Sequence, residues 1–93
     1  MNKVEKLLLE KEFRPNLKGF DYIVEAIELI QTNKIYLRAI TNKLYPTIAK
    51  NNNDTVSKVE RAIRHSIQSA KIGNSNSEFL ARIVLELKGE KDE

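Results

Sequence analysis

The side chains best suited to chemistry lie in the stretch from Val59 to Ile67, which holds two arginines and the chain's only histidine. On a helix each residue advances about 100°, so residues three or four apart share a face. One stripe is then apolar and comprises Val56, Val59, Ile63, Ile67 and Ala70. The other side is cationic and hydrogen-bonding and comprises Ser57, Lys58, Arg61, Arg64, His65 and Gln68. This pattern is typical of a helix that packs on a small domain and enters the major groove of DNA.

Basic charge is concentrated in the middle of the chain. Residues 34–71 hold eight lysines and arginines against two acids, a balance of +6. Residues 1–33 carry −1 and residues 72–93 carry −2, within a net charge of +3. This asymmetry indicates a local surface for a polyanion rather than a generally basic protein.

Length and composition exclude several classes of protein. Ninety-three residues fit one domain, and the absence of cysteine excludes disulfides and thiolate metal sites. Apolar runs are far shorter than the ~20 residues that cross a bilayer, and the N-terminus does not resemble a signal peptide. A glycine-rich phosphate loop, paired carboxylates and a metal-ligand cluster are all missing, and His65 is a lone histidine. We therefore expect no enzyme, no cofactor, no metal and no membrane association, and a cytoplasmic, nucleoid-associated location.

Hydrophobic periodicity predicts an all-α fold, a compact bundle of five to six helices in one domain over residues 1–93. The expected helical segments are about 1–12, 18–31, 34–44, 46–52, 55–71 and 76–88. Gly19 and Pro46 are interpreted as backbone punctuation near helix starts. Ile72-Gly73-Asn74 is expected to stop the fifth segment, and residues 89–93 to form a solvated charged tail.

A helix-turn-helix is predicted between residues 46 and 71. Ala49 is the small residue that a close helix crossing needs, and Asn53 tolerates the positive φ of the turn. Asp54 or Thr55 is expected to cap the second helix. Farther along, Ser75 to Glu78 has capping-box spacing before the last helix.

Four segments carry a resemblance to a known family: 44–50 (Leu-Tyr-Pro-Thr-Ile-Ala-Lys), 59–67, 76–79 (Asn-Ser-Glu-Phe) and 18–27. Over about residues 4–88 the chain resembles the C-terminal DNA-binding effector domain of the master sporulation response regulator of endospore-forming Firmicutes. The resemblance implies a compact, winged-helix-like or sporulation-regulator type of helical domain that controls transcription. It also implies binding to double-stranded DNA at a TGTCGAA-like box, homodimers on DNA and contact with RNA polymerase.

The resemblance assigns roles to individual residues of the helix at 55–71. Glu60, Arg61, Arg64 and His65 match residues that approach bases and nearby phosphates, and Ser57 and Lys58 match positions near the helix start. Gln68 lies on the same polar side. The chain departs from the family in three ways: the receiver domain is not part of this sequence, segment 71–75 is much shorter, and Lys58 replaces an expected arginine. A lysine is a point charge, so it suits a phosphate better than a base.

Plainer interpretations exist for several of these residues. Glu60 precedes Arg64 by four residues, so it either accepts from a cytosine amino group or orients an arginine. Lys43 and Lys50 are interpreted as DNA phosphate contacts or as ordinary surface lysines. Tyr22 and Tyr45 are expected to pack in the core rather than to stack on bases.

Two functions remain open from the sequence. The first is a sequence-specific regulator that reads the major groove with the helix at 55–71. The alternative is a protein-interaction module or antagonist that keeps the fold and pairs with a full-length regulator. The basic middle of the chain favours the first.

Overall fold

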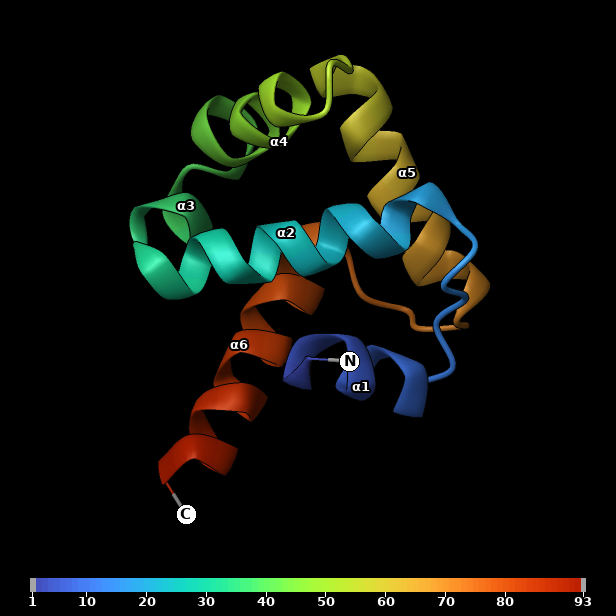
Figure 1. Cartoon of the computed structure of the whole chain (residues 1–93), viewed down its shortest axis with the longest axis vertical. Coiled ribbons are helices and arrows are strands. Elements are labelled where there is room, and N and C mark those ends of the chain that lie inside the picture. Colours follow the sequence, from blue (N-terminus) through green and yellow to red (C-terminus); the bar gives the residue numbers. More distant parts are fainter. Residues whose placement is uncertain (1, 93) are drawn as a thin grey trace.

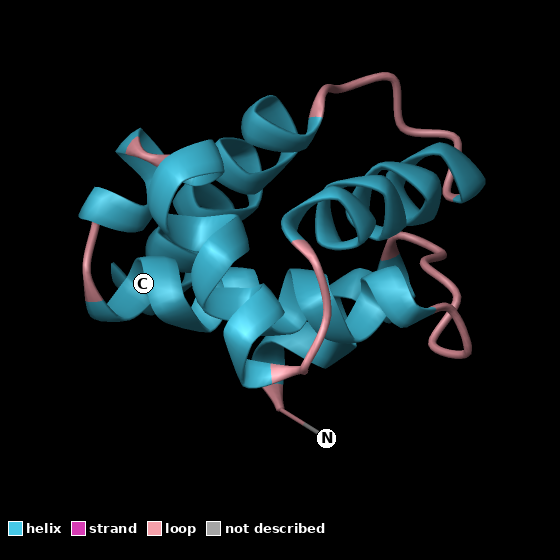
Figure 2. Cartoon of the chain, turned by 90° about the horizontal axis from the view of Figure 1, so that it is seen from above, coloured by secondary structure: helices cyan, strands magenta, loops and turns pink. Residues whose placement is uncertain are grey.

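The computed structural model describes residues 2–92, with side chains through residue 89. The elements are α1 (Lys3–Glu10), α2 (Lys18–Thr32), α3 (Ile35–Arg38), the π-helical segment η1 (Ile40–Leu44), α4 (Tyr45–Asn51), α5 (Val56–Ser69) and α6 (Asn76–Asp92). The predicted all-α fold is confirmed, and residues 2–92 contain no strand that could form a β-wing (Figure 2). No helix in this part of the chain is long and apolar enough to span a membrane.

Helix α2 runs through the middle of the molecule. In Figure 1, α4 lies above it, α5 runs from above it down past the end at which α2 begins, and α1 and α6 lie below. Its apolar residues at helical spacing are all buried: Phe20, Ile23, Ala26, Ile27 and Ile30. Within the described residues α2 contacts every other α-helix, so the remaining helices pack around it.

Helices α2 and α5 approach each other closely at Gly19. A Cβ atom built on Gly19 would lie 2.0 Å from the Ala62 carbonyl oxygen and 2.8 Å from the Ser66 Cβ. Both distances are too short for real atoms, so only glycine fits here. Gly19 lies near the start of α2 as expected, but its φ is not positive, and its role is to admit a neighbouring helix.

Three helices end in the same way. After α1, α4 and α5, one residue takes a positive φ: Glu12 (67°), Asn53 (52°) and Lys71 (60°). The next amide then donates to the carbonyl five residues back, as from Phe13 to Leu8 (3.0 Å), Asp54 to Ala49 (2.9 Å) and Ile72 to Ile67 (3.3 Å). These are Schellman endings, which satisfy carbonyls that a helix end otherwise leaves free.

The ending of α5 corrects the sequence interpretation. Asn53 was predicted to take the left-handed conformation, and it does. Helix α5, however, stops at Ser69 rather than residue 71, and Lys71, not Gly73, has the positive φ. The choice follows from burial, because this ending places the apolar Ile72 against the core.

Segment 34–44 is not the single helix that was predicted. It breaks at Ala39, whose φ of −133° and ψ of 58° are not helical, into α3 and η1. In η1 the Leu44 amide bonds to the Ala39 carbonyl five residues back, which is the wider π-helical spacing. Among the apolar residues of this segment only Leu44 is fully buried, and Ile35 stays 43% exposed.

The last helix is longer than predicted. Ser75 and Glu78 form the predicted capping box, since the Glu78 amide bonds to Ser75 Oγ (3.3 Å) and the Ser75 amide to Glu78 Oε1 (3.3 Å). The backbone of α6 then continues past Gly89 to Asp92, where a charged tail was expected. Lysine and glutamate are good helix formers, and an exposed glycine costs only about 1 kcal/mol. Met1 and Glu93 of the predicted end segments lie outside the described residues.

We predict that Gly19→Ala destabilises the protein by about 3 kcal/mol or more, because the new methyl group meets backbone atoms that cannot rotate away. Urea unfolding followed by circular dichroism measures the change. Gly73→Ala is the matched control: its Cβ would meet nothing within 4 Å, so its effect should stay within about 0.5 kcal/mol. Equal stabilities of the two variants would contradict the close crossing.

Candidate nucleic-acid interface

Helices α4 and α5 form the predicted helix-turn-helix. Ala49 is buried where the two helices cross, and Val59 and Ile63 are buried on the inner side of α5. Thr55 is the cap, since its hydroxyl oxygen accepts from the Lys58 amide at 3.2 Å. The start of α5 is therefore fixed by its own cap and by the turn before it.

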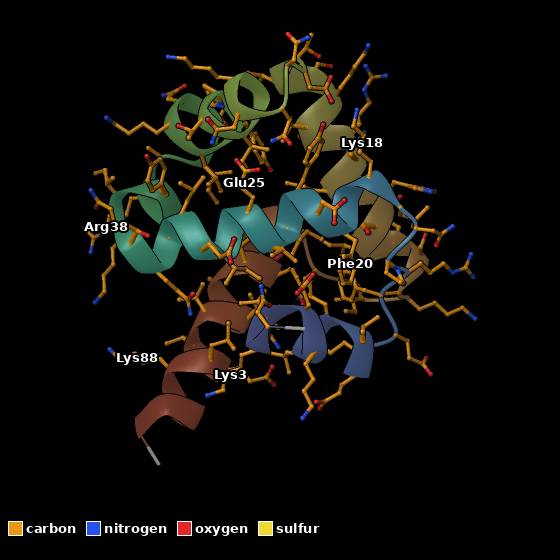
Figure 3. All side chains as sticks on the ribbon, viewed as in Figure 1. Lys3, Lys18, Phe20, Glu25, Arg38 and Lys88 are labelled. Carbon is orange, nitrogen blue, oxygen red and sulfur yellow. The ribbon has the colours of Figure 1, made fainter. Side chains whose placement is uncertain are left out.

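Asp54 ties this turn to α2. Its Oδ2 accepts from the Tyr22 hydroxyl at 2.5 Å and lies 3.2 Å from Lys18 Nζ, while its Oδ1 accepts from the Thr55 amide at 2.9 Å. The carboxylate side chain is only 7% exposed. The hydrogen bond from Tyr22, followed by that from the Thr55 amide, lowers the pKa of Asp54 to about 2. In Figure 3, Lys18 lies at the end of α2 nearest α5.

Glu25 makes a second tie between α2 and the end of α4. Its two carboxylate oxygens accept from Asn51 Nδ2 at 2.9 Å and from Asn52 Nδ2 at 2.8 Å. Figure 3 shows Glu25 on the side of α2 that faces α4. Helix α2 therefore holds the turn on both sides, through the contacts of Tyr22 and Lys18 with Asp54 and through Glu25.

The polar side of α5 is open to solvent along its whole length. All six residues predicted for this side are exposed: Ser57, Lys58, Arg61, Arg64, His65 and Gln68. Arg61 Nη2 donates to Ser57 Oγ at 3.2 Å. Val56 was expected on the buried stripe but is 37% exposed, because it is the first residue of α5 and lies beyond the α2 crossing.

Glu60 and Arg64 form an i,i+4 ion pair, with Nη1 and Oε1 2.6 Å apart. Glu60 is half-buried, and its backbone carbonyl accepts from Asn76 Nδ2 at 3.2 Å. The same amide nitrogen donates to the Tyr45 hydroxyl oxygen at 2.9 Å. This contact joins α4, α5 and α6 directly behind the pair, so the carboxylate that holds Arg64 stands on a fixed backbone.

Beside this pair lies a hollow of about 550 Å³, open to solvent. One wall consists of Glu60, Arg64 and Gln68, and the facing wall is the segment from Gly73 to Ser77. The short connection 71–75 therefore leaves the Arg64 side of α5 accessible to a ligand.

Lys43 and Lys50 are not part of this row. They come together on the outer side of η1 and α4, where they line a second hollow of about 420 Å³. Every residue that lines it comes from the range 33–50, and none from α5. The structure thus divides the sequence-predicted residues into one set on α5 and a separate lysine pair.

The two tyrosines pack as predicted, since Tyr22 and Tyr45 are 2% and 4% exposed. Sequence reasoning missed the partners of their hydroxyl groups, Asp54 and Asn76. Asp54 was considered as a helix cap, and Asn76 as part of the capping-box segment and of the family resemblance. The i,i+4 spacing of Lys18 and Tyr22 was the available sign that one face of α2 would meet an acid.

The fold and this surface define a helical domain with a helix-turn-helix whose second helix exposes a basic, polar side. A family model described as "Sporulation initiation factor Spo0A C terminal" matches residues 4–86. The chain therefore belongs to the family of Spo0A C-terminal domains, the DNA-binding effector domains of the sporulation regulator. It is a family of transcription-factor domains and not of enzymes.

We predict that Asp54→Asn lowers stability at neutral pH and reduces its loss in acid. The folded-state pKa of Asp54 is about 2, below the ordinary value near 4. Its stabilisation is therefore present above about pH 4 and disappears as the pH falls toward 2. Urea unfolding between pH 2 and 7 should show a shallower decline for Asp54→Asn than for the wild type. Asp21→Asn, which removes an exposed carboxylate from the same end of α2, should keep the wild-type slope.

Proposed function

We propose that this domain is a sequence-specific, double-stranded DNA-binding transcriptional regulator that places α5 in the major groove. The observation that carries the proposal is the continuous polar row on α5, exposed from Ser57 to Gln68 while the opposite stripe is buried. A recognition helix needs such a free face and a fixed backbone. The contacts of Asp54 and the crossing at Gly19 supply the fixed backbone.

The residues of the row take different roles. Arg61 and Arg64 have the forked geometry for guanine edges, and Lys58 suits a phosphate beside the groove. The 2.6 Å contact favours Glu60 as the residue that orients Arg64 over Glu60 as an acceptor for cytosine. Ser57 holds Arg61 near the start of the helix, and His65 and Gln68 contact the groove or a phosphate farther along.

The expected target is a TGTCGAA-like box, as the resemblance implies, on DNA at the nucleoid. One module covers little DNA, so tight binding requires two copies on tandem or palindromic boxes, as homodimers would provide. Contact with RNA polymerase follows from the same resemblance and is part of the proposal.

Duplex binding tests the proposal directly. A labelled duplex with a TGTCGAA box should bind more tightly than a scrambled duplex of the same composition in fluorescence anisotropy. Affinity for both should fall steeply with salt, since phosphate contacts release counterions. Equal affinities would refute sequence-specific reading. Binding to neither duplex would favour the alternative, a module that pairs with a full-length regulator.

Single substitutions on α5 distinguish recognition of the base sequence from non-specific attraction to the DNA backbone. Arg61→Ala should lose about 1–3 kcal/mol of discrimination between the box and the scrambled duplex, because a bidentate base contact disappears. Lys58→Ala should weaken binding to both duplexes alike and should reduce the slope of log affinity against log salt concentration by about 1. Anisotropy titrations at several salt concentrations measure both effects. Identical behaviour of the two variants would contradict the division of roles.

A further inference from the structure

The outer side of α3, η1 and α4 carries a surface that DNA reading by α5 does not use. We call it the α3–α4 patch and define it by Ile35, Tyr36, Lys43, Pro46 and Lys50, which line the hollow of about 420 Å³. Ile35 is 43% exposed, one of three large apolar side chains exposed among the described residues. The lining therefore combines accessible apolar groups with two ammonium groups.

The charge around this patch has one sign. From Leu29 to Asn53 the chain carries Lys34, Arg38, Lys43 and Lys50 and not one acid. None of the residues that line the hollow is acidic, and neither lysine of the patch forms a salt bridge within the described residues. Glu25, the acid bonded to the end of α4, is engaged by Asn51 and Asn52.

We propose that the α3–α4 patch docks an acidic, amphipathic segment of another protein. The segment would place apolar side chains on Ile35, Tyr36 and Pro46 and carboxylates against Lys43 and Lys50. A DNA backbone would satisfy the lysines but would cover the exposed isoleucine with phosphate and sugar, which gains little from an apolar contact. The mixture of apolar surface and flanking lysines fits a protein ligand better.

This inference does not depend on DNA reading by α5. No residue of α5 lines the hollow of the patch, so we expect the domain to hold DNA and a protein segment together. A variant of the patch should then leave duplex affinity unchanged, and a variant of α5 should leave docking unchanged.

The test uses a designed probe and the full chain. The probe is a labelled helical peptide with leucines on one face and glutamates on the other, and its affinity is measured by fluorescence anisotropy. Two comparison peptides are a polyglutamate of equal length and the same design with lysine in place of glutamate. Both should bind at least about fivefold more weakly, because one lacks the apolar contact and the other the charge.

Two substitutions in the patch have matched controls. Ile35→Ser and Lys43→Glu should each lower the affinity for the peptide at least about fivefold. Leu85→Ser removes an apolar side chain that is 68% exposed on α6, and Lys88→Glu reverses an exposed charge on the same helix. Both controls should bind like the wild type. Circular dichroism checks that all four variants fold, which their exposure favours.

Several results would overturn the proposal. These are no peptide binding to the wild type, equal losses in patch and control variants, or polyglutamate binding as tightly as the amphipathic probe. A parallel loss of affinity for the TGTCGAA duplex in Ile35→Ser and Lys43→Glu would assign the patch to DNA instead. Self-association of the wild type in sedimentation, abolished by Ile35→Ser, would assign it to a second copy of the chain.

Discussion

The arrangement of this domain depends on one close crossing, that of α2 over α5 at Gly19. The Ala62 carbonyl occupies the space that a side chain would fill, and Ser66 lies alongside. With no side chain between them, the two backbones approach more closely than ordinary helix packing allows. This contact therefore sets the position and orientation of α5 relative to α2, and with them the positions of the polar side chains that α5 carries. A larger residue at position 19 would push the whole exposed row outward.

The same end of α2 also controls the turn that precedes α5. Lys18 and Tyr22 flank Gly19 in sequence, and both contact the Asp54 carboxylate. One helical turn of α2 therefore fixes the middle of α5 through packing and its beginning through hydrogen bonds. Because α5 is already ordered, docking it into a groove would lose little conformational entropy. A small entropy loss on binding matters for a single small module, because its contact area with DNA is limited.

The sequence predicted the helices whose apolar residues repeat at regular spacing, and the structure confirms α2, α4, α5 and α6 with shifts of a few residues. It predicted the turn at Asn53 because the conformational preference of asparagine is local. The prediction of a single helix over residues 34–44 was wrong because the break at Ala39 depends on where α4 must lie, and no local sequence signal marks that break. Glu12 and Lys71 were missed for a similar reason: the burial of Phe13 and Ile72 outweighs the strain of a positive φ in residues that seldom adopt it.

The candidate site shows the same division between local and tertiary information. Helical spacing alone placed the polar residues of α5 on one exposed side, since a 3.6-residue period leaves few alternatives. The contact of Asp54 with Tyr22 joins residues 32 positions apart, and single-sequence patterns carry little information at that separation. Likewise, Lys43 and Lys50 were interpreted as phosphate contacts or ordinary surface lysines, and only the fold shows that they line one hollow to which α5 contributes no residue.

The two arginines of α5 differ in a way that bears on their roles. Arg64 is paired with a carboxylate, which orients the guanidinium but also offsets its charge toward DNA. Arg61 is held by the neutral hydroxyl of Ser57, which orients it without reducing its charge. In the proposed complex, a phosphate backbone would therefore meet Arg61 and Lys58 as the strongest attractive groups near the start of the helix. In that complex Arg64 would contribute chiefly through geometry, because its pairing with Glu60, whose carbonyl is bonded to Asn76, restricts the direction of the guanidinium.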